Sequence, residues 1–177
     1  IKPGKIARKY NSSGSYVELS PIFETASWLK SQQNWYYQKQ GQLVQNSWIK
    51  DSGSWYFMDD KGVMFNKTWL YQGGSWYAFK SSGAMISADW LYDNGSWYYL
   101  KDSGSMATGW LKDGGTWYYL KDSGSMATGW IKDNGSWYYL KDSGAMATGW
   151  IKDNGKWYYL ASSGNMLSNT RTPDGYY

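Results

Sequence analysis

Tryptophan recurs in this chain at a fixed spacing, and its ring can hold a positively charged group. The face of an indole ring carries partial negative charge and attracts cations, quaternary ammonium groups above all. Ring faces around a gap offer no hydrogen-bond donor to a carboxylate and no paired donors, such as those of an arginine, to a phosphate. The 14 tryptophans all fall in pairs seven positions apart, namely Trp28 and Trp35, Trp48 and Trp55, Trp69 and Trp76, Trp90 and Trp97, Trp110 and Trp117, Trp130 and Trp137, and Trp150 and Trp157. The pattern therefore predicts aromatic cages for a bulky, weakly hydrated cation.

Other kinds of chemistry find little support in the composition. Histidine and cysteine are both absent, so the commonest general base, disulfides and thiolate metal sites are excluded. We expect no catalytic residue and no metal or cofactor. The repeated aspartates, such as Asp133 and Asp142, fall in expected turns, where their side chains would bond the local backbone. A net charge of +4 is too small for a nucleic-acid binder, and no apolar run approaches the length of a membrane span.

The tryptophans must be positioned by a short element that repeats about every 20 residues. Residues 130–132 and 137–140 are rich in aromatic and branched side chains, as strands are. Asn134-Gly135 lies between them, and Asn-Gly between two such runs is a strong hairpin signal. The pattern predicts a hairpin in each unit, with a second turn at residues 142–144.

The two-residue loop also fixes which side chains share a face of the hairpin. It pairs Lys132 with Trp137 and Trp130 with Tyr139, so both tryptophans point to one side. Tyr138 points to the other side, toward the tryptophans of the preceding unit. We therefore expect Trp110, Trp117 and Tyr138 to surround one gap between units, with Met126 close in sequence.

Because a lone hairpin is marginal in water, each unit must bury its faces against its neighbours. The predicted fold is an all-β solenoid of stacked hairpins with little aliphatic core, in which Trp and Tyr supply most of the buried area. Residues 1–26 are read as a degenerate repeat or cap, and residues 170–177 as the truncated start of a further unit. The full repeats are predicted at 27–46, 47–67, 68–88, 89–108, 109–128, 129–148 and 149–169.

The repeat GW-x-K-D-N-G-x-WYYL-K-D-S-G-x-M-A-T resembles the choline-binding repeat of Gram-positive bacterial cell-wall proteins, notably those of pneumococci and their phages. The resemblance covers about 27–169 and is closest in the last four units. It implies a left-handed spiral of hairpins and choline as the ligand. It also implies a secreted, non-catalytic module that anchors its parent protein to phosphocholine on teichoic and lipoteichoic acids of the wall. A peptidoglycan hydrolase elsewhere in the parent protein is a further expectation, and the oligomeric state stays open.

The resemblance places a choline site between consecutive repeats, built from two aromatics of one repeat, one of the next and a methionine. The methionines carried over are Met64, Met85, Met106, Met126 and Met146. The cages carried over are Trp48 and Trp55 with Tyr77, Trp69 and Trp76 with Tyr98, Trp90 and Trp97 with Tyr118, Trp110 and Trp117 with Tyr138, Trp130 and Trp137 with Tyr158 and, with Leu43 in place of a methionine, Trp28 and Trp35 with Tyr56. The seventh pair, Trp150 and Trp157, is expected to lack its full partner. The two repeats of 21 residues, 47–67 and 68–88, are expected to rotate their neighbours differently and to leave their sites distorted or empty.

Three alternatives stay open at this point. The rings can simply pack as a hydrophobic core. A core would tolerate Leu, Ile or Phe, however, whereas this chain has tryptophan at the same two positions of every repeat. Lysines such as Lys112, Lys132 and Lys152 can meet polymer phosphates or form a solvated face. The rival function is a glucan- or carbohydrate-binding repeat of the related hairpin-solenoid class, in which sugars stack on aromatic rings.

Overall fold

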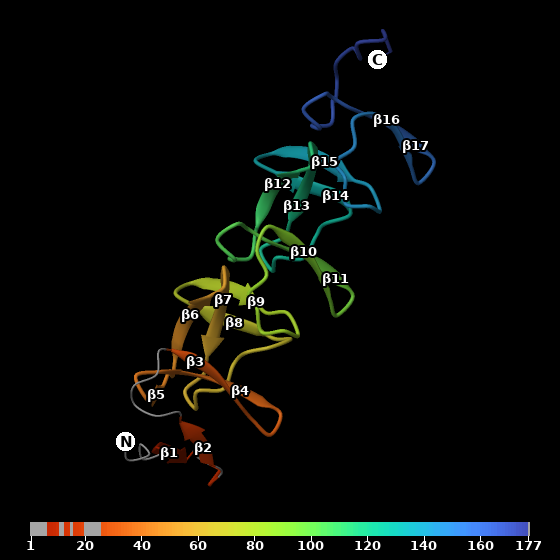
Figure 1. Ribbon diagram of the computed structural model, residues 1–177. Coiled ribbons are helices and arrows are strands. Elements are labelled where there is room, and N and C mark those ends of the chain that lie inside the picture. Colours follow the sequence, from red (N-terminus) through yellow and green to blue (C-terminus); the bar gives the residue numbers. More distant parts are fainter. Residues whose placement is uncertain (1–6, 11–12, 15, 20–25, 177) are drawn as a thin grey trace. The chain divides into compact units, whose positions relative to one another are not determined.

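The computed structural model describes residues 7–10, 13–14, 16–19 and 26–176, and all regular structure in them is β-strand (Figure 1). The strands follow one another as antiparallel hairpins, and only the second hairpin has a third strand. The predicted all-β class built from hairpins is confirmed. The pairs are β1 (Ala7–Tyr10) with β2 (Tyr16–Leu19), β3 (Ser27–Ser31) with β4 (Asn34–Lys39) and β5 (Gln42–Leu43), β6 (Ser47–Asp51) with β7 (Ser54–Met58), β8 (Trp69–Gln72) with β9 (Ser75–Ala78), β10 (Asp89–Asp93) with β11 (Ser96–Leu100), β12 (Gly109–Asp113) with β13 (Thr116–Leu120), β14 (Gly129–Asp133) with β15 (Ser136–Leu140), and β16 (Gly149–Asp153) with β17 (Lys156–Leu160).

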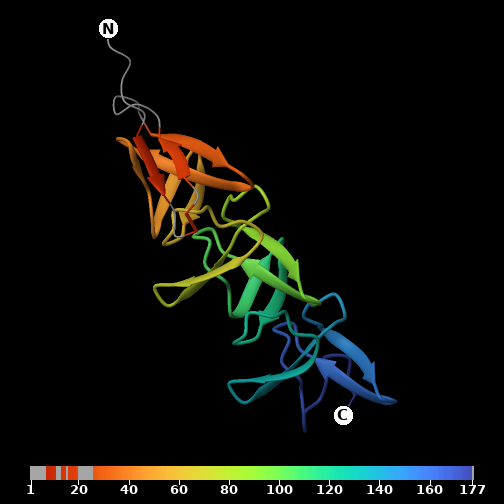
Figure 2. The same cartoon turned by 90° about the horizontal axis from the view of Figure 1, so that it is seen from below.

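The chain divides into two compact units, residues 1–87 and 88–177. The first unit contains β1 to β9 and the second contains β10 to β17. Figure 2 shows the same strands from below. In the described part of the chain no helix is long and apolar enough to cross a membrane.

The β14–β15 hairpin has the register that its turn residues predict. Asn134 and Gly135 have φ angles of 44° and 83°, the left-handed pair that a type I′ turn requires. The turn aligns Lys132 with Trp137 and Trp130 with Tyr139, as expected. Both tryptophans therefore project from one face of the hairpin.

A second turn follows the β14–β15 hairpin and leads the chain back to the hairpin before it. The Lys141 amide donates to the Ala145 carbonyl oxygen at 2.9 Å, and the Gly144 amide donates to the Lys141 carbonyl at 2.7 Å. This turn brings Met146 beside Leu140 in a β-bridge. The Met146 amide then donates to the carbonyl of Trp117, in the preceding hairpin, at 2.8 Å. The methionine thus ties two repeats together through its backbone.

Glycine in this second turn is required by packing as well as by conformation. Gly144 has a φ of 83°, and a Cβ placed on it would lie 2.2 Å from the Met126 sulfur. Gly164 approaches Met146 in the same way. No side chain larger than hydrogen fits without moving the methionine. The side chain of each such methionine is therefore packed against the turn of the following repeat.

The fully buried positions of the second unit are aliphatic. Leu100, Leu120, Leu140 and Leu160, one in each repeat, have no exposed surface. The composition argument, which gives the buried area mainly to Trp and Tyr, misses this leucine column. The second tryptophan of each pair is instead exposed, by 39% for Trp117 and 62% for Trp157.

The first unit has a more varied core than the second. Tyr36 and Leu43 form one buried cluster, and Ile49, Met58 and Met64 belong to another. Near the start of the chain, β1 and β2 form a hairpin where the sequence echoes the later repeats. The rest of the predicted cap at 1–26 lies largely outside the described residues.

Candidate functional site

Trp110, Trp117 and Tyr138 surround one cavity, as the hairpin register predicts. The Trp110 and Trp117 ring centroids are 6.3 Å apart and their planes meet at 87°. Tyr138, from the next hairpin, lies 4.8 Å from Trp110 at 68°. The cavity has a volume of about 250 Å³, and Met146 and Ser163 complete its lining. Three successive repeats therefore contribute to one site.

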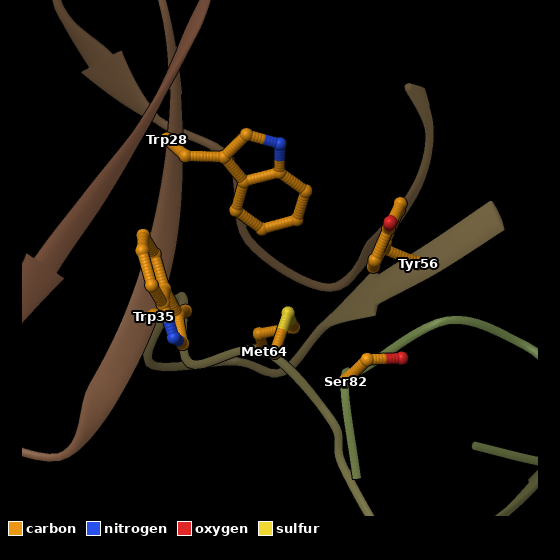
Figure 3. A pocket seen from close by; sticks show the side chains of 5 residues that line it. All are labelled: Trp28, Trp35, Tyr56, Met64 and Ser82. Carbon is orange, nitrogen blue, oxygen red and sulfur yellow. The ribbon is translucent and has the colours of Figure 1, made fainter. Parts of the chain in front are cut away.

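The same arrangement occurs at the start of the first unit (Figure 3). In Figure 3, Trp35 and Tyr56 stand on opposite sides of the opening, with Trp28 above and between them and the Met64 side chain and Ser82 below. The cavity measures about 270 Å³. Three ring faces, a thioether and a hydroxyl thus line a pocket that contains no ionised side chain.

The rings predicted around Tyr158 also come together. Tyr158, in β17, lies 4.8 Å from Trp130 at an interplanar angle of 68°. Trp137, the second tryptophan of the β14–β15 hairpin, lies 6.4 Å from Trp130 at 86°. Tyr158 therefore lies beside Trp130, as the hairpin register predicts. The Met166 amide donates to the Trp137 carbonyl at 2.7 Å, so the backbone contact to this pair comes from the following repeat.

Two of the predicted ring sets differ in whether all their members belong to one compact unit. Trp90 lies 4.9 Å from Tyr118, its predicted partner, within the second unit. The predicted cage of Trp69, Trp76 and Tyr98 combines residues of both units. That cage stays a prediction, and so does a role for Met106 in choline binding.

Two of our expectations about irregular repeats are wrong. The 21-residue repeat at 47–67 does not distort its rings, because Trp48 lies 6.4 Å from Trp55 and 5.0 Å from Tyr77. Leu43 does not take the place of the methionine in the first cage either, because Met64 lines that cavity. Leu43 packs against Tyr36 in the core instead.

The methionine of each described cage comes from the repeat after the tryptophan pair. The sequence argument places Met126 beside Trp110 and Trp117, but Met146 lines that cavity. The hydrogen bond from the Met146 amide to the Trp117 carbonyl explains the difference. Met126 bonds to Trp97 and Met85 to Trp55 in the same way. The same offset accounts for Met166, which the sequence argument omits.

The seventh tryptophan pair is also complete, contrary to expectation. Tyr176 lies 5.9 Å from Trp150, and the two rings are almost perpendicular, at 87°. With Trp157 and Asp174 they line a cavity of about 550 Å³. A turn positions the tyrosine, since the Thr172 amide donates to the Tyr176 carbonyl at 2.7 Å. The sequence periodicity misses Tyr176 because this tyrosine lies two positions before the place where a 20-residue repeat would put the partner tyrosine.

The first tryptophan of a pair donates its indole N–H to an acceptor 23 or 24 residues later in the chain. Trp110 Nε1 donates to Asp133 Oδ2 at 3.1 Å. In the second repeat the acceptor is an amide, since Trp48 Nε1 donates to Gln72 Oε1 at 2.9 Å. The remaining bonds are Trp28 to Asp51 at 3.0 Å, Trp90 to Asp113 at 3.0 Å, Trp130 to Asp153 at 3.2 Å and Trp150 to Asp174 at 2.8 Å.

These bonds correct our interpretation of the aspartates that end the first strand of each hairpin. The sequence argument has the side chain of Asp133 bond its local backbone, but it accepts a hydrogen bond from the preceding repeat. The signal is present in the sequence, because an Asp or Gln recurs 23 or 24 residues after the first tryptophan of each pair. The lining serines, such as Ser163, also recur at one position of the repeat and were missed.

The lysine opposite the second tryptophan lies over its ring. Lys132 Nζ is 5.8 Å from the Trp137 centroid, and Lys112 Nζ is 5.7 Å from that of Trp117. These lysines are exposed, so a solvated face and contact with polymer phosphates both stay open. In β10, Tyr92 replaces the lysine and lies 5.1 Å from Trp97.

Ionisable groups beside the cages have shifted pKa values. Burial raises the pKa of the Tyr99 phenol, and the charges of Asp113, Asp102 and Asp89 raise it further. The hydrogen bond from Trp150 lowers the pKa of Asp174, and a bond from Thr172 lowers it further. Asp174 therefore stays ionised beside its cavity. Among the residues that the structure describes, no group of three or more acidic side chains is placed to hold a metal ion.

Comparison with known proteins decides the family. The model of the choline-binding repeat matches residues 92–128 and 127–170, and that of a putative cell wall binding repeat matches 46–64 and 67–85. The solved choline-binding domain of CbpL from Streptococcus pneumoniae is 38% identical, with a TM-score of 0.73, and the match covers 86% of this chain and 83% of that one. The chain belongs to the choline-binding repeat family. No curated protein sequence matches it.

Two further structures extend the family comparison. Choline-binding protein F of S. pneumoniae is 38% identical over 90% of this chain and 57% of its own, with a TM-score of 0.73. The pneumococcal cell wall endolysin of phage Cp-1, solved with choline, is 41% identical over 74% of this chain and 40% of its own, with a TM-score of 0.53. This chain thus spans just over half of choline-binding protein F.

The choline-binding repeat module has the fold of the hairpin solenoids that it matches. Its matches are to binding modules, which makes it a binding module and not an enzyme. The matches to cell wall binding repeats and to pneumococcal choline-binding proteins associate it with the bacterial cell surface.

Proposed function

We propose that this module binds choline through its aromatic cages and so anchors its parent protein to phosphocholine on teichoic and lipoteichoic acids of the cell wall. The observation that carries the proposal is the cavity lined by Trp110, Trp117 and Tyr138. Its rings face an open space and are not packed as core. Trimethylammonium is large, weakly hydrated and cationic, which is what such a lining favours.

The exposure of the tryptophans supports a cage over a purely structural role. Trp117 is 39% exposed and Trp137 is 41% exposed, whereas Leu120 and Leu140 beside them are fully buried. Leucine therefore supplies the interior of each repeat, and the second indole ring is left to the solvent. Exposed tryptophan at every repeat is costly in solubility unless a ligand uses it.

Repetition compensates for the weakness of a single site. One exposed cation–π contact contributes about 0.5–1 kcal/mol, and more when it is desolvated. Linked sites on one chain raise the avidity for a repeating ligand by roughly 10²–10⁴. A polymer that displays phosphocholine along its length fits this requirement. The parent protein of such a module would be secreted, and a peptidoglycan hydrolase is one activity that it could carry.

Chromatography tests the proposal against carbohydrate binding. The module is loaded on a resin that carries a quaternary amine and is challenged with free choline, with dextran and with NaCl at matched ionic strength. We expect elution by choline alone. Elution by dextran but not by choline would support the glucan-binding alternative, and failure of the folded module to bind the resin would refute the proposed function.

A further inference from the structure

The acceptor of the indole proton differs between cages in charge but not in geometry. Asp133 holds Trp110 at 3.1 Å and Gln72 holds Trp48 at 2.9 Å. The rings that they hold are arranged alike, with Trp–Trp distances of 6.3 Å and 6.4 Å. The cage at Trp48 is thus a natural variant in which the wall is intact and the negative charge is missing.

That charge lies close enough to act on a bound cation. A cation over an indole face sits within about 6 Å of the ring centroid. The carboxylate is bonded to the edge of the same ring, so the two charges are separated by less than the Debye length of about 8–10 Å. The carboxylate also draws the indole proton, which leaves more negative charge on the ring face. Both effects favour a cation over a neutral molecule of the same shape.

We propose that the residue accepting the indole proton determines how strongly its cage prefers a cation to a neutral ligand. The aspartates Asp51, Asp113, Asp133, Asp153 and Asp174 give their cages this preference. Gln72 gives the cage of Trp48, Trp55 and Tyr77 a weaker one. The inference rests on the proposed function, because it assumes that the cages hold choline.

The C-terminal cavity is where the charge is closest to the ligand. Asp174 both bonds to Trp150 and lines the cavity. At the cages of Trp28 and Trp110 the aromatic rings, a methionine and a serine line the space instead. The preference for a cation should therefore be greatest at Trp150 and smallest at Trp48.

Site-resolved titration tests the inference. Each indole N–H gives its own signal in a ¹H–¹⁵N spectrum, and the signals of Trp48, Trp110 and Trp150 are assigned from single Trp→Phe variants. The protein is titrated with choline and with 3,3-dimethyl-1-butanol, the neutral molecule of the same shape. The ratio of the two dissociation constants at each indole measures the preference for charge, which a purely structural role of the acceptor would leave unchanged.

Three variants give the expected pattern. Asp133→Asn keeps an acceptor oxygen and removes the charge, and it should lower the ratio at Trp110 roughly two- to fivefold. Gln72→Glu adds a charge and should raise the ratio at Trp48 by a similar factor. Asp142→Asn, in an exposed turn of the same repeat, should change neither ratio. Gln72→Glu keeps the test decisive even if the Asp133 variant unfolds.

The two hypotheses fail in different ways. A folded wild-type protein whose indole signals do not respond to choline would refute the proposed function and this inference with it. Choline binding with the same ratio at Trp48 and Trp110, unchanged in Asp133→Asn and Gln72→Glu, would overturn this inference alone.

Discussion

Each cage wall is an indole ring that several contacts hold in place before any ligand arrives. Trp110 donates its N–H to Asp133, and its ring meets that of Tyr119 at 5.1 Å and 76°. Lys112 lies over the ring of Trp117, the second indole of this cage, which is nearly perpendicular to Trp110. Because these rings are already positioned, binding would immobilise few side chains, and little affinity would be lost to ordering.

Removing one wall should remove one site. Trp117→Ala deletes a ring that is 39% exposed, so we expect the module to stay folded and to lose about one choline equivalent. Trp117→Phe keeps an aromatic face and should retain the site with weaker affinity. Calorimetric titration measures both, and an unchanged stoichiometry in the alanine variant would exclude Trp117 from a cage.

On acidification, the hydrogen bond between Asp174 and Trp150 should be lost at a lower pH than the ordinary pKa of aspartate predicts. The bond from Trp150 lowers the pKa of Asp174. The stabilisation from this carboxylate is therefore complete above about pH 3.9, the ordinary value for aspartate, and is lost as the pH falls through the lowered value. The indole N–H signal of Trp150 should titrate with a midpoint below about 3.9, while Asp174→Asn should abolish the titration. A midpoint at or above the ordinary value would contradict the assignment.

At the scale of the hairpin, two glycines with the same backbone conformation have different tasks. Gly135 and Gly144 both have a φ of 83°. A Cβ on Gly135 would meet nothing within 4 Å, whereas one on Gly144 would lie 2.2 Å from the Met126 sulfur. Gly135 is therefore needed only for the positive φ of the turn, whereas Gly144 also lets the turn pack closely against Met126 of the preceding repeat.

Alanine at the two positions should separate these tasks. Gly135→Ala should cost about 1–2 kcal/mol of unfolding free energy, for the left-handed conformation alone. Gly144→Ala should cost about 1–3 kcal/mol more, because Met126 must move. Urea denaturation of the two variants measures the difference. Equal losses would show that the contact with Met126 is not a constraint.

The sequence predicts the hairpins well because their determinants are local. Asn134-Gly135 sets the turn type, the turn sets the register, and the register puts Trp130 and Trp137 on one face. The contacts between hairpins are harder to predict, because the period does not reveal the offset at which one repeat meets the next. That offset decides that Met146, and not Met126, lines the Trp110 cage.

At the scale of the molecule, the proposed function requires several weak sites to act together. Cages are complete within each of the two compact units, for example at Trp28 in the first and at Trp110 in the second. A net charge of +4 adds only weak steering toward an anionic polymer. The affinity for a wall polymer should therefore come from the number of cages engaged at once.

A repeating ligand should bind much more tightly than free choline. We expect an apparent affinity for a polymer that displays many choline groups to exceed the monovalent affinity by roughly 10²–10⁴. Surface plasmon resonance on polymers of high and low choline density measures the difference. Retention that did not depend on choline density, or that NaCl abolished, would indicate charge-driven binding instead.

The most direct test of the account is a calorimetric titration of the intact module with choline, followed by circular dichroism to confirm that the chain stays folded. The aromatic cages predict saturable binding of more than one choline per chain. The binding should be lost stepwise as Trp35, Trp117 and Trp137 are each replaced by alanine. A folded module that bound no choline, or that bound it equally well without these three rings, would contradict the cage as the functional unit of this protein.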